Sequence, residues 1–438
     1  MKGKSLSKNI RIATKWSTIT EFVAKMFVPV TNMILARLLT PDAFGVIATV
    51  ILIISFADML SDSGFQKYLI QRDFKTHKEK IESINVAFWT NISISILLWL
   101  LIVVFQENIA ILVGNPGLGM VIAIAGISLP LTSFSSIQMS IYRRDLDFKT
   151  LFHVRLVGVL IPFFITIPLA LLGLSYWSLV IGMVSGHLAN AILLTIKSYW
   201  KPTLFYKFSV LKRMLSFSLW SLAEAISIWA TTYIGVFIVS GELNNYYLGL
   251  FQTTMVTVNG ILAIITTATT SVLFSSLSRL QNNEDEYLKV FLKFMRFIGM
   301  IVLPMGVGIF IYRNLLTDIL LGEQWQEASL FVGLWGLISS ITIVFGQYCS
   351  EIYRSKGRPR LSLLVQILYL LGLLPTIMIT AKYGYTSLIY GQSLIKIHQI
   401  LVNWLVVYIA FKISPVMMVK NLLPPIFCSI LMGGLPSF

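Results

Sequence analysis

Long apolar stretches recur along the whole chain and are separated by short polar connections. Each stretch has roughly the 20 residues that an α-helix needs to cross the hydrocarbon core of a bilayer. The pattern therefore predicts an all-α polytopic membrane protein of about 12–13 transmembrane helices. The clear stretches cover residues 15–38, 44–63, 84–105, 118–141, 151–172, 177–196, 214–239, 248–274, 291–311, 328–349, 361–380 and 387–411. A weaker thirteenth stretch, residues 422–435, contains two prolines and two glycines.

Composition agrees with this pattern. Hydrophobic residues make up 56% of the chain and charged residues 12%, whereas about a quarter of a soluble domain is charged. No small-residue cleavage site follows the basic N-terminal segment, so we expect the first span to be retained. The two cysteines lie in apolar stretches, which argues against a disulfide framework or a zinc site and favours buried thiols.

Basic residues fall in alternate connections. One side, which includes the N-terminal tail, carries 28 of the 34 lysines and arginines. The other side carries only Arg37, Arg313 and Lys382. This bias predicts that the N-terminus is cytoplasmic. The net charge of +15 then follows from topology, and we expect no nucleic-acid partner.

The two halves of the chain resemble each other. The motif that opens the sixth span, Tyr176–Gly182, returns as Tyr385–Gly391 at the start of the twelfth. Several such matches have offsets of 203 to 211 residues and occur in the same order in both halves. Six spans per repeat leave both halves in the same orientation, which predicts a pseudo-two-fold axis along the membrane normal and a site between the halves. We therefore expect two six-helix bundles, residues 1–200 and 201–411, and a partial extra transmembrane segment, residues 412–438.

Carboxylates at membrane depth are candidates for ion coupling, because an ionisable group there is costly and usually functional. Glu21 and Lys25 lie four residues apart in the first span and suit an ion pair. Glu224, the repeat mate of Glu21, has no such lysine and could carry a proton. Asp58 and Asp62 lie one turn apart and suggest a gate or a cation site. Purely structural pairing, hydrogen bonding or loop ordering would explain each of them equally well.

Basic groups form a second set. The repeat register aligns Lys396 in the twelfth span with His187 in the sixth, so we expect both to face one cavity. Arg37 follows the first span. The structural alternatives are a hydrogen-bonded interior histidine and an interfacial anchor.

Signs of catalysis are missing from the sequence. It contains no nucleotide-binding loop, metal-ligand cluster or nucleophile elbow. No connection exceeds about 20 residues, which leaves no room for a soluble catalytic domain. We expect no catalytic residues, no metal and no cofactor, and hence a transporter rather than an enzyme.

Several motifs resemble one family. The segment Leu35–Gly45 (LARLLTPDAFG), the segment Asp62–Arg72 and the segment Arg143–Lys149 (RRDLDFK) are similar to signature segments of bacterial polysaccharide transporters. These belong to the multidrug/oligosaccharidyl-lipid/polysaccharide exporter superfamily, and the motifs most resemble the colanic acid and teichuronic acid type exporters. Family members usually have fourteen spans.

The resemblance implies a flippase in the bacterial cytoplasmic membrane. Its substrate would be an undecaprenyl-pyrophosphate-linked oligosaccharide for cell-surface polysaccharide, with a proton or sodium as coupling ion and a polysaccharide polymerase as a candidate partner. Cations suit a pyrophosphate. The candidate substrate contacts are Lys25, Arg37, Lys396 and His187, and the candidate coupling residues are Glu21, Glu224 and Asp58.

Other functions remain possible on the sequence alone. A multidrug or small-cation antiporter on the same fold would favour an acidic, aromatic lumen, against which Lys25 and Lys396 argue. A membrane glycan polymerase or transferase would need larger soluble loops. A structural scaffold would not need charges at membrane depth.

Overall fold

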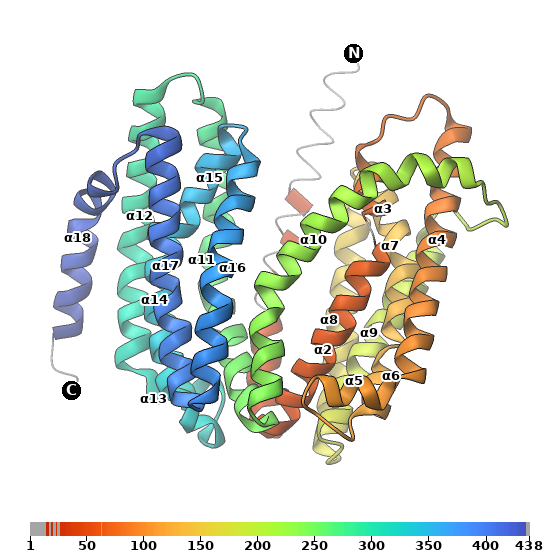
Figure 1. The fold of residues 1–438 in the computed structure, drawn as a ribbon, viewed down its shortest axis with the longest axis horizontal. Helices are drawn as coiled ribbons and strands as arrows, with labels where there is room; N and C mark the ends of the chain where they lie inside the picture. The colour runs from red at the N-terminus through yellow and green to blue at the C-terminus, as the bar shows by residue number, and fades with distance from the viewer. Residues whose placement is uncertain (1–14, 17–18, 21–22, 24–26, 63, 435–438) are drawn as a thin grey trace. The chain divides into compact units, whose positions relative to one another are not determined.

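The described part of the chain consists of helices joined by short irregular connections. A computed structural model describes residues 15–16, 19–20, 23, 27–62 and 64–434, except for the side chains of residues 216–221, 223, 224, 268, 271 and 359. Its contacts divide the chain into two compact units, unit 1 (Met1–Asn245) and unit 2 (Tyr246–Phe438). The predicted all-α fold is confirmed (Figure 1).

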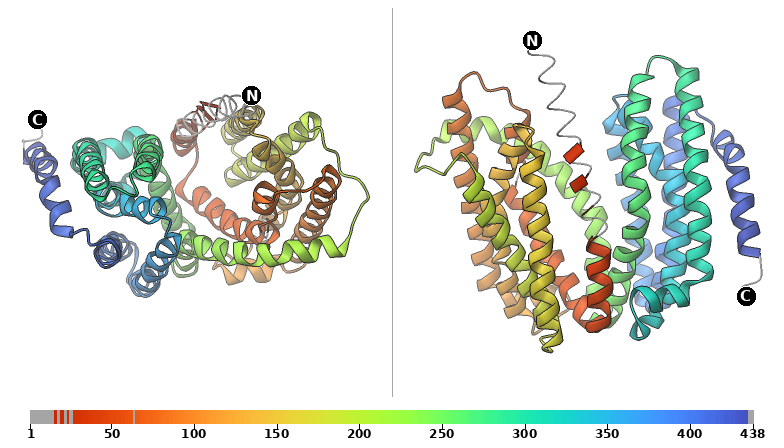
Figure 2. Two further views of the ribbon diagram at one scale, coloured as in Figure 1. Left: turned by 90° about the horizontal axis from the view of Figure 1, so that it is seen from above. Right: turned by 180° about the vertical axis from the view of Figure 1, so that it is seen from behind.

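Unit 1 is a bundle in which α7 packs against α2, α3, α4 and α9. Its helices after the described apolar helix Phe27–Leu38 are α2 (Pro41–Asp62), α3 (Phe65–Gln71), α4 (His77–Val104), α5 (Gln106–Leu112), α6 (Gly119–Ala125), α7 (Ser128–Arg144), α8 (Phe148–Leu171), α9 (Tyr176–Lys197) and α10 (Phe208–Glu242). At one end Phe65, Phe88 and Met214 form a buried cluster. This cluster fixes the first turns of α10 over α3 and α4, and Figure 2 shows α10 running along the unit.

Unit 2 is a second bundle, in which α12 packs against both α14 and α18, and α17 packs against α16 and α14. Its elements are α11 (Asn245–Arg279), α12 (Glu284–Ile311), α13 (Arg313–Leu320), the 3-10 helix η1 (Glu323–Ala328), α14 (Ser329–Thr342), the π-helix η2 (Ile343–Gln347), α15 (Tyr348–Ser355), α16 (Pro359–Lys382), α17 (Tyr385–Phe411) and α18 (Pro415–Gly434). Gly299 lets α18 approach α12 closely, because a Cβ there would lie 2.7 Å from the Leu422 side chain.

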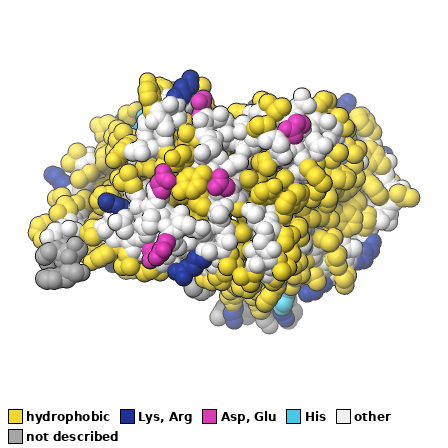
Figure 3. All heavy atoms as spheres, turned by 90° about the horizontal axis from the view of Figure 1, so that it is seen from below, with side chains coloured by type: hydrophobic (Ala, Val, Ile, Leu, Met, Phe, Trp, Pro, Cys, Tyr) yellow, Lys and Arg dark blue, Asp and Glu magenta, His cyan; other side chains and the backbone are white. Residues whose placement is uncertain are grey.

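Twelve helices among the described residues are long and apolar enough to cross a membrane. They include α18, which covers the weak thirteenth stretch, whereas the predicted first span is described as a helix only over Phe27–Leu38. Large hydrophobic side chains are exposed along many of these helices, and the face in Figure 3 is largely hydrophobic with sparse charges. Cys349 is buried as predicted, but the prediction is wrong for Cys428, which is exposed on α18.

The sequence repeat has a counterpart in local structure. The side chain of Thr76 caps α4 by accepting from the amide of Glu79, and Asn283 caps α12 in the same way from Glu286. Both capped helices have 28 residues and are followed after one residue by a short helix, α5 or α13. Equivalent caps at equivalent places support a duplicated bundle, since cap residues set where a helix begins.

The contacts place α10 in unit 1, although the sequence division at residue 200 assigned it to the second bundle. Ser240 near its end is buried and shares hydrogen bonds with Thr49 and Asn115, at 3.1 and 2.8 Å. Gly114 lies beside it with a φ of 75°, and a Cβ there would meet the Ser240 carbonyl oxygen at 2.4 Å. These contacts explain the division after Asn245. The repeat boundary itself stays a prediction.

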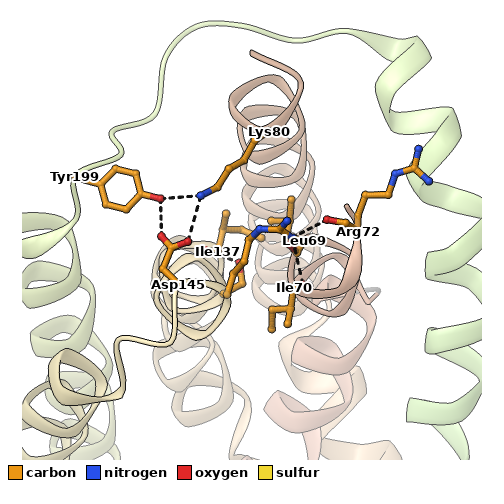
Figure 4. Close-up of polar contacts among 9 residues, drawn as sticks. Leu69, Ile70, Arg72, Lys80, Ile137, Asp145 and Tyr199 are labelled. Atoms are coloured by element: carbon orange, nitrogen blue, oxygen red, sulfur yellow. Dashed lines mark hydrogen bonds and ion pairs between the residues drawn. The ribbon is translucent and has the colours of Figure 1, made fainter. Parts of the chain in front are cut away.

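Two cations fix the connections at one end of unit 1 (Figure 4). The Arg144 guanidinium donates to the carbonyls of Leu69 and Arg72, both at 2.7 Å, and to that of Ile70. Beside it the Lys80 ammonium lies 3.3 Å from the Asp145 carboxylate, which also accepts from the Tyr199 hydroxyl at 2.9 Å. The ends of α3, α4, α7 and α9 are thereby joined.

Replacing Arg144 with alanine should lower the thermal stability of the protein. The change leaves three carbonyls at the end of α3 without their charged donor, and hydrogen bonds to charged groups contribute about 1.5–3 kcal/mol. Thermal unfolding in detergent measures the effect. The matched control is Arg143→Ala, because Arg143 is exposed and makes only a 3.5 Å contact with Gln66. Equal midpoints for the two variants would contradict the assigned role.

Candidate functional site

A polar cavity of about 670 Å³ lies inside unit 1. Side chains from α2, α3, α4, α7, α8 and α9 reach it, in a bundle whose helices are otherwise strongly apolar. Its charged and polar lining comprises Thr20, Asp58, Asp62, Gln66, Lys67, Asn91, Thr132, Ser133, Ser135, Ser136, Arg143, Arg155, His187 and Asn190. A cavity with this lining is polar and roomy enough for water or a solute.

Asn91 of α4 organises one wall of the cavity. It is 1% exposed, accepts from the Ser61 hydroxyl at 2.7 Å and donates to the Ser136 hydroxyl at 2.8 Å. Ser133 also donates to it, at 3.2 Å. One amide therefore joins α4 to α2 and α7. These hydrogen bonds help to fix this wall of the cavity.

Two carboxylates of α2 face the same cavity. Asp58 accepts from the Thr132 hydroxyl at 2.7 Å. Asp62 lies one turn further along α2, and its Oδ1 is buried without a hydrogen-bond partner among the described residues. Carboxylates placed this way can take up a proton or a small cation, because an incompletely partnered buried charge is costly.

Three cations and one histidine complete the charged lining. Lys67 lies on α3, Arg143 lies in the last turn of α7, and Arg155 lies two turns into α8. All three are exposed residues, whereas His187 in the middle of α9 is half-buried. The cations therefore lie toward the end of unit 1 where α7 ends and α8 begins, at the accessible part of the cavity.

Lys396 occupies a different setting in unit 2. Its ammonium lies 5.2 Å from the centroid of the Trp335 ring and 5.1 Å from that of Tyr369. It donates to the Gln399 side chain at 3.1 Å. Two aromatic faces hold this cation through cation–π attraction and one amide through a hydrogen bond, and the described part of the chain shows no carboxylate partner for it.

The structure brings together only some of the residues predicted from sequence. Asp58 and His187 line the unit 1 cavity, and Arg37 is exposed at the end of its helix. Glu21 and Lys25 lie outside the described residues, and the side chain of Glu224 on α10 is not described. A cavity shared by His187 and Lys396 stays a prediction, as do the roles of all these residues.

Sequence reasoning missed most of the cavity lining. Lys67 and Arg143 count among the basic residues that the topology explains, and neither Arg155 nor Asn91 is among the residues predicted from sequence. The sequence does single out Asp58 and Asp62 as a gate or a cation site, and Asp58 as a candidate coupling residue. A polar residue in the middle of an apolar span, such as Asn91 or Thr132, was the available signal.

Comparison with known sequences identifies relatives. A family described as polysaccharide biosynthesis protein matches residues 34–330. The chain is 22% identical over 414 residues to the lipopolysaccharide biosynthesis protein WzxC of Escherichia coli (strain K12), with 92% of this chain and 81% of that protein covered. It is 20% identical over 440 residues to the teichuronic acid biosynthesis protein TuaB of Bacillus subtilis (strain 168), covering 98% and 88%.

Two solved structures resemble the chain in fold. The lipid II flippase MurJ, in an inward closed conformation, has a TM-score of 0.76 at 15% identity, with 96% of this chain and 93% of that chain covered. An inward-facing multidrug resistance MATE family transporter of the MOP superfamily has a TM-score of 0.64 at 14% identity, covering 96% and 99%. At these identities the likeness shows the fold alone, and it fits the predicted two-bundle architecture.

Replacing Asn91 with alanine should destabilise unit 1. It removes the amide that pairs with the hydroxyls of Ser61, Ser133 and Ser136, and each lost hydrogen bond costs about 0.5–1.5 kcal/mol. Thermal unfolding in detergent is again the measurement. Ser135→Ala is the control from the same cavity, because Ser135 donates only to carbonyls of its own helix. A stability loss as large for Ser135→Ala as for Asn91→Ala would refute the network.

Proposed function

Because the chain belongs to the polysaccharide biosynthesis protein family, we propose that it is a flippase for a lipid-linked oligosaccharide. The substrate is an undecaprenyl-pyrophosphate-linked glycan, which moves from the inner to the outer leaflet of the bacterial cytoplasmic membrane. The glycan then enters cell-surface polysaccharide synthesis. Transport proceeds by alternating access and is coupled to a proton or sodium gradient.

The unit 1 cavity is the observation that carries this proposal. A pyrophosphate carries negative charge at neutral pH and binds best to lysine and arginine side chains. Lys67, Arg143 and Arg155 offer such donors at the accessible part of a cavity in an apolar bundle. Polar walls of serine, threonine and asparagine suit the hydroxyl groups of a sugar. In the predicted topology this end is cytoplasmic, where the substrate is loaded.

Lys396 supplies a second anion contact in this proposal. Its ammonium, which lies over the Trp335 ring and donates to Gln399, can exchange Gln399 for a phosphate oxygen. Lys25 and Arg37 remain candidate contacts from the sequence. Among the carboxylates, Asp58 takes the coupling ion, since it shares the cavity with the proposed anion site.

A small-cation or multidrug antiporter is the second candidate. The specific observation in its favour is that Asp58 and Asp62 line the same cavity. Such a carrier would bind its cargo through these carboxylates and would not need Lys67, Arg143 or Arg155. The two functions therefore differ in the charge of the cargo, which is negative for the flippase and positive for the antiporter.

Removing the cavity cations should abolish glycan export. We expect the double variant Lys67→Gln/Arg143→Gln to lose most transport of a lipid-linked oligosaccharide, because each lost charge-assisted contact weakens anion binding by about 1.5–3 kcal/mol. Lys396→Ala should also reduce transport of the lipid-linked oligosaccharide. Transfer of labelled substrate in proteoliposomes measures both.

The control for this loss is Lys289→Gln/Lys293→Gln. Both lysines are exposed on α12 and remote in sequence from the cavity lining, so export should continue. Full export by the cavity variants would overturn the proposed anion site. The antiporter would be favoured if the unaltered protein showed no glycan export and the cavity variants still exported cations.

Replacing Asp58 with asparagine should uncouple transport from the ion gradient. Asparagine keeps the size and the partner Thr132 but cannot bind or release a proton at neutral pH. We expect transport in vesicles to lose its dependence on an imposed pH or sodium gradient. Glu224→Gln tests the residue predicted from sequence in parallel, and gradient dependence that is unchanged in both variants would refute carboxylate coupling at these positions.

A further inference from the structure

We propose that the connection from α9 to α10 and the first turns of α10 form a docking surface for anionic lipid headgroups. The linker patch consists of the apolar side chains of Leu204, Tyr206 and Phe208 and the cations Lys207, Lys212 and Arg213. This inference goes beyond transport of a substrate. It assigns a partner to a surface that the candidate site does not use.

The linker is held against α4 by three hydrogen bonds. The backbone amide of Thr203 donates to the Asn85 side chain at 3.0 Å, and the Thr203 carbonyl accepts from the Trp89 indole at 2.8 Å. The Tyr206 hydroxyl lies 3.1 Å from that of Thr90. The linker is therefore fixed along about one and a half turns of α4, and its outward side chains have a defined position.

The geometry of α4 puts this contact at the level of the headgroups. Its 28 residues extend about 42 Å at about 1.5 Å per residue, whereas the hydrocarbon core is about 30 Å thick. Exposed apolar side chains continue to the end at Val104, and no charged residue follows Glu82 within the helix. Counting about 20 residues back from Val104 reaches Asn85, where the linker is attached.

The apolar part of the linker patch is unusually exposed. Leu204 is 97% exposed and Phe208 is 69% exposed, although backbone contacts hold the segment in place. In contrast, Val210 and Met214 on the inner side of α10 are buried in the bundle. The first turns of α10 thus have one face toward the protein and another that no described residue covers.

Charge identifies the partner of this outer face. Lys207, Lys212 and Arg213 are exposed, and no acidic residue occurs between Tyr199 and Glu224. Near an anionic membrane surface each such cation favours association by about fivefold. Apolar side chains at the level of the headgroups next to exposed cations are typical of segments that lie in the interface of an anionic bilayer.

A fluorophore at position 204 can test the proposal on the full chain. The protein carries Leu204→Cys in a Cys349→Ser/Cys428→Ser background and is labelled with an apolar fluorophore. It is reconstituted into phosphatidylcholine bilayers with or without phosphatidylglycerol. We expect the acrylamide quenching constant to fall several-fold when phosphatidylglycerol is present, because the label moves into the interface.

The charge requirement is tested with two matched triple variants. Lys207→Gln/Lys212→Gln/Arg213→Gln should remove most of the phosphatidylglycerol effect, whereas Lys289→Gln/Lys293→Gln/Arg296→Gln, equally exposed on α12, should keep it. Gel filtration of each variant confirms folding. The proposal would be overturned if the label on the otherwise unaltered chain were quenched equally with and without phosphatidylglycerol. It would also be overturned if the label were shielded only after a soluble protein was added. Neither readout depends on glycan transport, so the outcome is separate from that of the proposed function.

Discussion

Polar side chains inside an apolar bundle must find partners within the protein, and this constraint shapes the described structure. Helices satisfy their own backbone groups, but buried amides and hydroxyls in the spans are costly unless they are hydrogen-bonded. Asn91 joins α4 to α2 and α7 through serine hydroxyls. Near the other end of α2, Asn115 and Ser240 join it to α10. The positions of these helices follow from satisfying a few polar atoms.

Charges obey the same constraint in a different way. A carboxylate or guanidinium in a packed core would cost several kcal/mol unless it were fully paired. Asp58 has one short hydrogen bond, to Thr132, and Asp62 Oδ1 has none within the described part of the chain. These groups therefore border a cavity instead of a packed core. Lys396 shows the other solution, because two aromatic rings replace the water around its ammonium. Glu351 shows a third solution, because its buried carboxylate pairs with Arg354 at 3.1 Å.

The sequence predicted the features that depend on local pattern. Hydropathy predicted the spans, because it acts within one continuous segment. The repeat agrees with matching helix caps at Thr76 and Asn283, and a cap acts within a single turn. It did not predict which charges converge, because Lys67 and Arg143 belong to helices far apart in the chain and look like ordinary loop cations. It also could not assign α10 to unit 1, which depends on tertiary contacts such as those of Ser240. Residues that are distant in sequence and meet only in the folded protein leave no periodic pattern in the sequence, whereas hydropathy does.

The mixed charge of the unit 1 cavity has a consequence for coupling. An anion that binds to Lys67, Arg143 and Arg155 enters a cavity that also holds Asp58 and Asp62, so the carboxylates oppose its binding by Coulomb repulsion. A proton or cation on a carboxylate removes this repulsion and raises the affinity for the anion. By linkage, the bound anion raises the affinity for the cation by the same factor. Electrostatics alone therefore favours a cavity that holds the anion and the cation together, which suits co-transport. Exchange of one for the other would require in addition that the two compete for the same side chains.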